Sequence, residues 1–113
     1  MAGITIWHNP NCGTSRTALA LLRAAGHDVT VVEYLKTPPD AATLARVAAA
    51  VGGARALLRT RGTTAEARGL PQADDATILA AMLADPILIN RPVVIGPGGT
   101  LLARPSERAL EAA

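Results

Sequence analysis

Cys12 is the only cysteine in the chain, and it lies in the segment whose residue types are best suited to chemistry. It follows His8 by four residues and precedes Arg16 by four, in a run of polar and turn-forming residues. Sulfur attacks as the thiolate, yet a free cysteine is mostly protonated at neutral pH because its pKa is about 8.5. The start of a helix, with positive charge expected from His8 and Arg16, lowers that pKa. The pattern predicts a reactive thiolate.

A lone cysteine can instead be a small buried hydrophobic residue. The polar turn around Cys12 favours the catalytic interpretation, so we take Cys12 and His8 as the catalytic candidates. Two roles remain open for His8, namely an electrostatic effect on the thiol and a hydrogen bond within the loop. The backbone N–H groups of Gly13, Thr14 and Ser15 are candidates for binding an anionic substrate.

The cysteine count also bears on partners and compartment. A single cysteine cannot form an internal disulfide, so a redox cycle through Cys12 requires a thiol from another molecule. It provides no disulfide framework either, which favours a reducing cytoplasm. A strand is expected almost at the first residue, without a signal peptide's basic stretch and apolar run, and no apolar stretch reaches membrane length. We therefore expect a cytoplasmic protein with no membrane partner.

Length and charge narrow the function classes further. The chain has 113 residues, which is enough for a single domain over 1–113. Eleven basic and nine acidic residues give a formal charge of +2, and the basic residues form no block. This balance argues against a nucleic-acid partner. We expect a monomer that binds no metal and no resident cofactor.

Hydrophobic patterning predicts an α/β fold. The first elements form a β-α-β unit, which implies a parallel strand pair with a right-handed crossover. Helices follow, and a β-hairpin and a last helix close the chain. This order predicts a thioredoxin-like fold with a mixed four-stranded sheet and a helical insertion at about 39–85. The expected elements are a strand at 4–7, a helix capped by Thr14 or Ser15 and running to Ala25, a strand at 29–33, helices within 39–85, strands at 93–95 and 100–102, and a terminal helix from 105.

The predicted hairpin places two arginines opposite each other. If the turn is centred between Pro97 and Gly98, residues at equal distances before and after this centre pair with each other. In this register Arg91 faces Arg104. Like charges in facing positions are unfavourable unless an anion lies between them or both extend into water. Each arginine precedes a proline, which holds it near extended geometry. In a thioredoxin-like fold the loop before this hairpin faces the reactive cysteine, and Pro92 fits that position.

These features together resemble the glutaredoxin-coupled arsenate reductases, over nearly the whole chain. The matching stretches are His8-Asn9-Pro10-Asn11-Cys12-Gly13-Thr14-Ser15-Arg16, Leu57-Leu58-Arg59, and Pro86-Ile87-Leu88-Ile89-Asn90-Arg91-Pro92 with Arg104-Pro105-Ser106-Glu107.

The resemblance implies a role for each matching residue. Cys12 matches the cysteine that attacks arsenate and forms a thiol–arsenate ester. Glutathione, as co-substrate, then attacks, arsenic is reduced to the trivalent state, and a glutaredoxin removes the mixed disulfide. Arg59, Arg91 and Arg104 match the arginines that hold the oxyanion, and His8 matches a histidine that helps to keep the thiol ionised. The implied function is arsenic detoxification.

Two other functions are compatible with this fold. Spx-type regulators bind RNA polymerase and usually carry a Cys-x-x-Cys switch, whose second cysteine is replaced here by Ser15. A regulator that senses through Cys12 alone stays open. The other alternative is a glutathione-dependent thiol transferase without oxyanion chemistry. The arginine trio favours the reductase over both.

Overall fold

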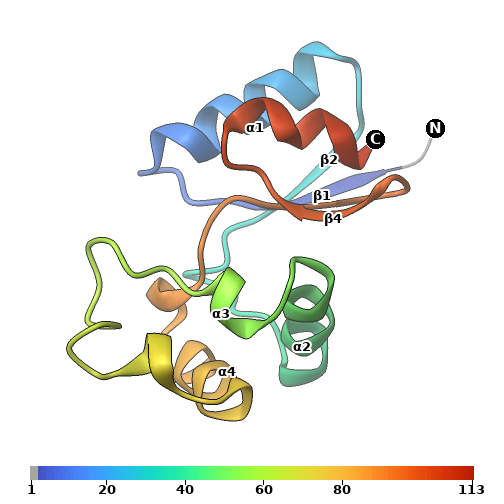
Figure 1. The fold of residues 1–113 in the computed structure, drawn as a ribbon. Helices are drawn as coiled ribbons and strands as arrows, with labels where there is room; N and C mark the ends of the chain where they lie inside the picture. Colours follow the sequence, from blue (N-terminus) through green and yellow to red (C-terminus); the bar gives the residue numbers. More distant parts are fainter. Residues whose placement is uncertain (1–2) are drawn as a thin grey trace. The chain divides into compact units, whose positions relative to one another are not determined.

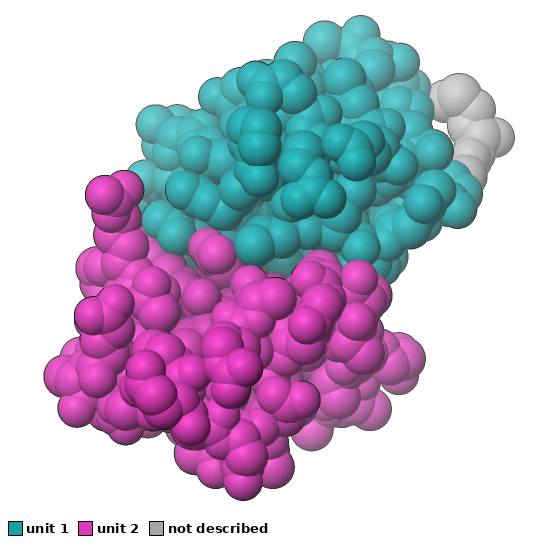
Figure 2. Space-filling model, in the orientation of Figure 1, with its two compact units in different colours: residues 1–37, 91–113 teal, residues 38–90 magenta. Residues whose placement is uncertain are grey.

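A computed structural model describes residues 3–113 of the protein. The chain separates into two compact units, coloured separately in Figure 2. Unit 1 consists of Met1–Thr37 with Arg91–Ala113, and unit 2 consists of Pro38–Asn90. The helical segment thus extends slightly beyond the predicted 39–85, and the single domain over 1–113 stays a prediction.

Unit 1 contains the sheet. Its strands are β1 (Ile4–Trp7), β2 (Val29–Val32), β3 (Val93–Gly96) and β4 (Gly99–Leu102), in the spatial order β2-β1-β3-β4. β1 pairs in parallel with β2, whereas the β1–β3 and β3–β4 pairs are antiparallel. The mixed four-stranded sheet of the predicted thioredoxin-like fold is therefore confirmed.

Helix α1 (Gly13–Ala24) connects β1 to β2, and η3 (Ser106–Ala112) follows β4. Figure 1 shows α1 and η3 side by side over the sheet. Their small side chains permit this close approach, because Ala18 on α1 and Ala109 and Ala112 on η3 belong to one buried cluster. The same cluster includes Ile4, Ile6, Leu22, Val94 and Ala103.

The hairpin has the predicted register. Ile95 pairs with Thr100 and Val93 pairs with Leu102, with Gly96 and Gly99 closing the turn. Two details of the helices differ from the prediction. The cap of α1 is Cys12 rather than Thr14 or Ser15, and the terminal helix is a 3-10 helix rather than an α-helix.

The buried residues of η3 recur with the period of a 3-10 helix. Its buried residues are Ser106, Ala109 and Ala112, which recur every three positions. Residues three apart eclipse one another in a 3-10 helix, which has three residues per turn. All three side chains therefore lie on one face of η3.

Unit 2 is helical. Its elements are α2 (Ala41–Ala50), α3 (Ala54–Leu57), η1 (Leu70–Gln72), α4 (Asp75–Ala84) and η2 (Pro86–Leu88). Aspartates cap the two longest helices of unit 2, α2 and α4: Asp40 Oδ1 accepts from the Thr43 N–H at 2.7 Å, and Asp74 Oδ1 accepts from the Thr77 N–H at 2.8 Å. Among the described residues, no helix is long and apolar enough to cross a membrane.

The hairpin turn packs tightly against η3, which leads to a prediction about stability. A Cβ added at Gly96 would collide with the backbone carbonyl of Ala112. We expect Gly96→Ala to lower the free energy of unfolding by about 1–3 kcal/mol, because overpacking forces the backbone apart. Urea unfolding measures the change, with Gly3→Ala as the control. A Cβ at Gly3 meets only the Asp28 carbonyl at 3.9 Å, so equal effects of the two substitutions would contradict the packing described here.

Candidate active site

Cys12 occupies the N-cap of α1, between the strand β1 and the helix. Its backbone is extended, with φ −102° and ψ 121°, and its side chain is partly exposed. The Cys12 N–H donates to the Asn9 carbonyl at 3.0 Å, and the Cys12 carbonyl accepts from the Arg16 N–H at 3.0 Å. These bonds close the loop and start the helix, which leaves the thiol at the end where backbone N–H groups lack helical partners.

The surroundings of Cys12 lower the pKa of its thiol. Burial acts in the opposite direction and raises the pKa, but nearby backbone N–H groups and arginine side chains outweigh it. The groups that lower the pKa are the Ser15 backbone N–H, the charge of Arg91, the Thr14 backbone N–H and the Arg104 side chain, in that order. Each of these stabilises the thiolate over the thiol. The structure thus supports the predicted reactive thiolate.

Arg91 and Arg104 lie next to each other where the hairpin begins and ends. The Ala103 N–H donates to the Pro92 carbonyl at 2.9 Å, which extends the hairpin by one pair. Nη1 of Arg104 donates to the Arg91 carbonyl at 3.1 Å. Both arginines precede cis prolines, Pro92 and Pro105. The facing arrangement predicted from the register therefore places Arg104 beside Arg91, and both arginines lower the pKa of Cys12.

His8, Asn9 and Ser15 form a buried polar network behind the thiol loop. His8 Nδ1 and Ser15 Oγ are 2.6 Å apart, and the Asn9 N–H donates to Ser15 Oγ at 3.0 Å. Since Ser15 Oγ already accepts from Asn9, its own O–H can donate to Nδ1 of a neutral imidazole; this tautomer is inferred from the network. Ser15 is fully buried and its hydroxyl holds the loop rather than capping α1.

The pKa of His8 favours one of its two open roles. Burial lowers this pKa; Glu33 raises it, and Arg23 and Arg16 lower it further, for a net decrease. A neutral imidazole contributes no full positive charge to the thiolate at neutral pH. The geometry therefore favours the hydrogen-bonding role within the loop over the electrostatic one.

The lowered pKa of His8 predicts a loss of stability in acid. A base whose pKa is lower in the folded state binds its proton less readily there than in the unfolded chain. The free energy of unfolding should therefore decrease as the pH falls below about 6.5, the unfolded value, towards the folded pKa. In His8→Asn this component should disappear, as measured by urea unfolding between pH 5 and pH 8 (roughly the histidine range). An unchanged pH dependence would contradict this, and His27→Asn tests whether the effect is specific to His8.

Arg16 contributes to the shape of the loop. Its Nη1 donates to the Pro10 carbonyl at 2.8 Å, and Asn9 Oδ1 accepts from the Asn11 N–H at 2.9 Å. The arginines that lower the pKa of Cys12 are Arg91, through its charge, and Arg104, through its side chain, and both are distant from Cys12 in sequence. Arg16 thus braces the loop, and the expectation that it also adds positive charge at the thiol stays a prediction.

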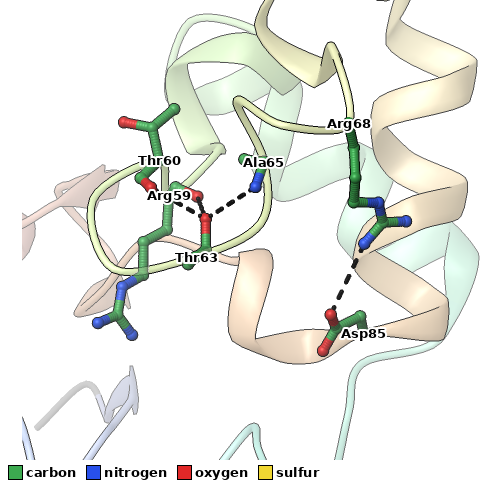
Figure 3. Close-up of polar contacts among 6 residues, drawn as sticks. All are labelled: Arg59, Thr60, Thr63, Ala65, Arg68 and Asp85. Atoms are coloured by element: carbon green, nitrogen blue, oxygen red, sulfur yellow. Dashed lines mark hydrogen bonds and ion pairs between the residues drawn. The ribbon is translucent and has the colours of Figure 1, made fainter.

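Arg59 lies in unit 2, in a loop that its own neighbours hold in place (Figure 3). The Thr63 hydroxyl donates to the carbonyls of Arg59 and Thr60, at 2.8 and 3.0 Å. Nε of Arg59 donates to the Arg61 carbonyl at 3.1 Å, and its backbone N–H donates to the Leu88 carbonyl at 2.8 Å. The role of Arg59 in binding an oxyanion stays a prediction from the family resemblance.

Ser106 is a contact of the site that residue types alone do not reveal. Its hydroxyl donates to the Thr14 carbonyl at 3.0 Å, although the two residues are 92 positions apart. The sequence signal was limited to its place after Arg104-Pro105. Within residues 3–113, no group of three or more His, Cys, Asp and Glu side chains is arranged to hold a metal ion.

The chain is similar to several known proteins named arsenate reductase. An arsenate reductase of Rhizobium meliloti (strain 1021) is 52% identical over 111 residues, covering 96% of this chain and 79% of that protein. One from Escherichia coli (strain K12) is 46% identical over 114 residues, covering 98% and 81%. The solved structure of an arsenate reductase from Vibrio cholerae superposes with a TM-score of 0.90 at 35% identity, covering 99% of this chain and 98% of that one.

The ArsC family model matches most of the chain, residues 7–112. The matched residues include Cys12, the helices of unit 2, and the hairpin with Arg91 and Arg104 at its ends. With that match, and with relatives that are similar over nearly its whole length, the chain belongs to the ArsC family.

Proposed function

We propose that this protein is an arsenate reductase in which Cys12 is the nucleophile. The observation that carries the proposal is the combination at Cys12 of a thiol with a lowered pKa and two arginines, Arg91 and Arg104, that contribute to lowering it. A thiolate beside guanidinium groups suits attack on a tetrahedral oxyanion, because the groups that stabilise the sulfur anion can also neutralise the substrate. Membership in the ArsC family supports the same substrate.

In the first step the Cys12 thiolate attacks pentavalent arsenic. An S–As bond forms and an As–O bond breaks, and the oxygen leaves as water after taking up protons. Arg91 and Arg104 stabilise the negative charge that develops on the remaining oxygens. Arsenic remains pentavalent in this step, because one As–O bond is exchanged for one S–As bond.

The second and third steps need thiols from other molecules, because the chain has one cysteine. Glutathione attacks Cys12 sulfur, an S–S bond forms, and the electron pair of the S–As bond remains on arsenic, which leaves as arsenite. Both sulfurs are thereby oxidised to a mixed disulfide while arsenic gains two electrons. A glutaredoxin thiol then takes over the glutathione and releases the Cys12 thiol.

Further residues complete the proposed site. Gly13, Thr14 and Ser15 present backbone N–H groups at the start of α1, and Arg59 is the remaining arginine that the resemblance assigns to the oxyanion. His8 holds the loop through Ser15 and thereby keeps these N–H groups in place. We place the protein in the cytoplasm, where glutathione is abundant, as a monomer without a resident cofactor.

A coupled assay tests the proposal. Purified protein with glutathione, glutaredoxin, glutathione reductase and NADPH should consume NADPH only when arsenate is added. Turnover of a mixed disulfide substrate without any response to arsenate would identify a thiol transferase instead. Co-purification with RNA polymerase, together with no arsenate turnover, would identify a regulator.

A further inference from the structure

Arg16 places a positive charge against the exposed side of the thiol loop. Its Nη1 donates to the Pro10 carbonyl at 2.8 Å, and its Nη2 lies 3.7 Å from the position that a Cβ on Gly13 would take. Arg16, Pro10 and Gly13 are all exposed, and Cys12, between Pro10 and Gly13 in sequence, is partly exposed. The guanidinium group therefore lies beside solvent-exposed residues on both sides of Cys12 in the loop.

The hydrogen bond to the loop does not explain the charge of Arg16. A guanidinium group has several N–H donors, and one neutral donor is enough for the Pro10 carbonyl. The ion pairs found among residues 3–113 do not include Arg16, and the first turn of α1 holds no acidic residue. A cation near the positive end of a helix is unfavourable. The charge thus strengthens neither the helix nor an ion pair of the described chain, and it is available to an anion at the loop.

The co-substrate of the proposed reaction brings such an anion. Glutathione is γ-glutamyl-cysteinyl-glycine, and its glycine carboxylate follows directly after the reacting cysteine. Two extended residues span about 7 Å (roughly 3.5 Å each). Cys12 and Arg16 are one helical turn apart, since the Arg16 N–H donates to the Cys12 carbonyl, and side chains at this spacing are neighbours. A glutathione whose sulfur is at Cys12 therefore has its glycine carboxylate within reach of Arg16.

We propose that Arg16 is a specificity-determining residue for the attacking thiol, which binds the glycine carboxylate of glutathione while the glutathione sulfur attacks at Cys12. A planar guanidinium group offers paired N–H donors that match the two oxygens of a carboxylate. This inference deepens the proposed function and rests on it for the identity of the co-substrate. The contact itself needs no arsenate, so it is tested apart from arsenate reduction.

The test uses a mixed disulfide of Cys12 with 2-thiopyridine, which forms at Cys12 alone because the chain has one cysteine. The glutathione thiolate attacks Cys12 Sγ and a new S–S bond forms. The bond to the thiopyridyl sulfur breaks, and its electron pair leaves with the thiopyridone, whose absorbance gives the rate. In Arg16→Gln, which keeps a neutral donor, the rate with glutathione should fall about threefold, the size expected for an ion pair open to water.

Two thiols that lack the carboxylate separate recognition of charge from the shape of the loop. With 2-mercaptoethanol, and with the glycine ethyl ester of glutathione, Arg16→Gln should react as fast as the wild type. Arg16→Lys keeps the charge and should retain most of the preference for glutathione over its ester. If Arg16→Gln does not fold, the wild type still gives the comparison: it should prefer glutathione over the ester about threefold more than a small thiopyridyl disulfide does.

Arg23→Gln is the matched control for charge. Arg23 is exposed in the last turn of the same helix, so its removal changes the net charge equally but at the other end of α1. It should leave the rate with glutathione unchanged. Equal losses in Arg23→Gln and Arg16→Gln would mean that net charge governs the encounter with glutathione, and the inference would be wrong.

Two further results would overturn the inference. A loss in Arg16→Gln that is as large with 2-mercaptoethanol as with glutathione would show that Arg16 acts only through the shape of the loop. A loss confined to the removal of glutathione from Cys12 by glutaredoxin would assign Arg16 to the protein partner instead. A selective loss with glutathione in a protein that does not reduce arsenate would retain this inference and refute the proposed function. Arsenate turnover without the selective loss would do the reverse.

Discussion

Cys12→Ser is expected to abolish arsenate-dependent NADPH consumption, with a loss of at least about a thousandfold. A serine hydroxyl is not ionised near neutral pH, and its oxygen cannot form the mixed disulfide through which two electrons reach arsenic. The backbone N–H groups and arginines that lower the pKa of Cys12 remain in place in the variant, so the loss of activity reports the missing sulfur. The coupled assay with and without arsenate measures the effect.

The position of Cys12 makes this substitution a clean test. Cys12 is the N-cap of α1 and makes no side-chain cap bond there, whereas serine is among the preferred N-cap residues. The variant should therefore unfold at the same urea concentration as the wild type, or at a higher one. Full arsenate turnover by a folded Cys12→Ser protein would show that Cys12 is not the nucleophile.

Arg104→Ala and Arg91→Ala are expected to lower kcat/KM for arsenate by about 10²–10³-fold each, which corresponds to about 2.7–4 kcal/mol of transition-state stabilisation. Each arginine lowers the pKa of Cys12. In the proposed reaction each also neutralises the negative charge that develops on the arsenate oxygens. The double variant should lose less than the product of the single losses, because adjacent groups in one site do not act independently.

Arg108→Ala is the matched control for charge. Arg108 is exposed, its Nη1 donates to the Leu102 carbonyl at 3.3 Å, and its Nε lies 3.8 Å from Glu111 Oε2. Removing it changes the net charge as much as Arg104→Ala does but leaves the surroundings of Cys12 intact. Equal losses in Arg108→Ala and Arg104→Ala would mean that overall charge, rather than a local oxyanion site, controls the reaction.

Local patterns allowed much of the fold to be predicted. The short β-branched strands and the helix between them gave the β-α-β unit, and the Pro97-Gly98 turn gave the register that brings Arg91 beside Arg104. These features depend on residues close together in sequence, or on a turn that leaves only one pairing. The arginine pair was therefore a geometric prediction, and the placement of Cys12 at the start of α1 followed from the loop that precedes it.

The parts that sequence reasoning missed depend on contacts between distant residues. Ser15 has the residue type of a helix cap, but a buried His8 engages its hydroxyl and Cys12 takes the cap position. Ser106 has the type of a first-turn residue in the last helix, and only the packing of η3 on α1 reveals its bond to Thr14. The 3-10 form of η3 likewise depends on that packing, which overrides the α-helical propensity of its alanines.

Arsenate protection of Cys12 tests the central claim most directly. Because the chain has one cysteine, the mass gained during iodoacetamide treatment reports Cys12 alone. We predict rapid alkylation of Cys12 near neutral pH, at a rate that falls progressively as arsenate is added. In Arg104→Ala, the same arsenate concentrations should lower the alkylation rate less. Alkylation that begins only near the pKa of a free cysteine (about 8.5) and proceeds at the same rate with and without arsenate would contradict an ionised sulfur beside an oxyanion site.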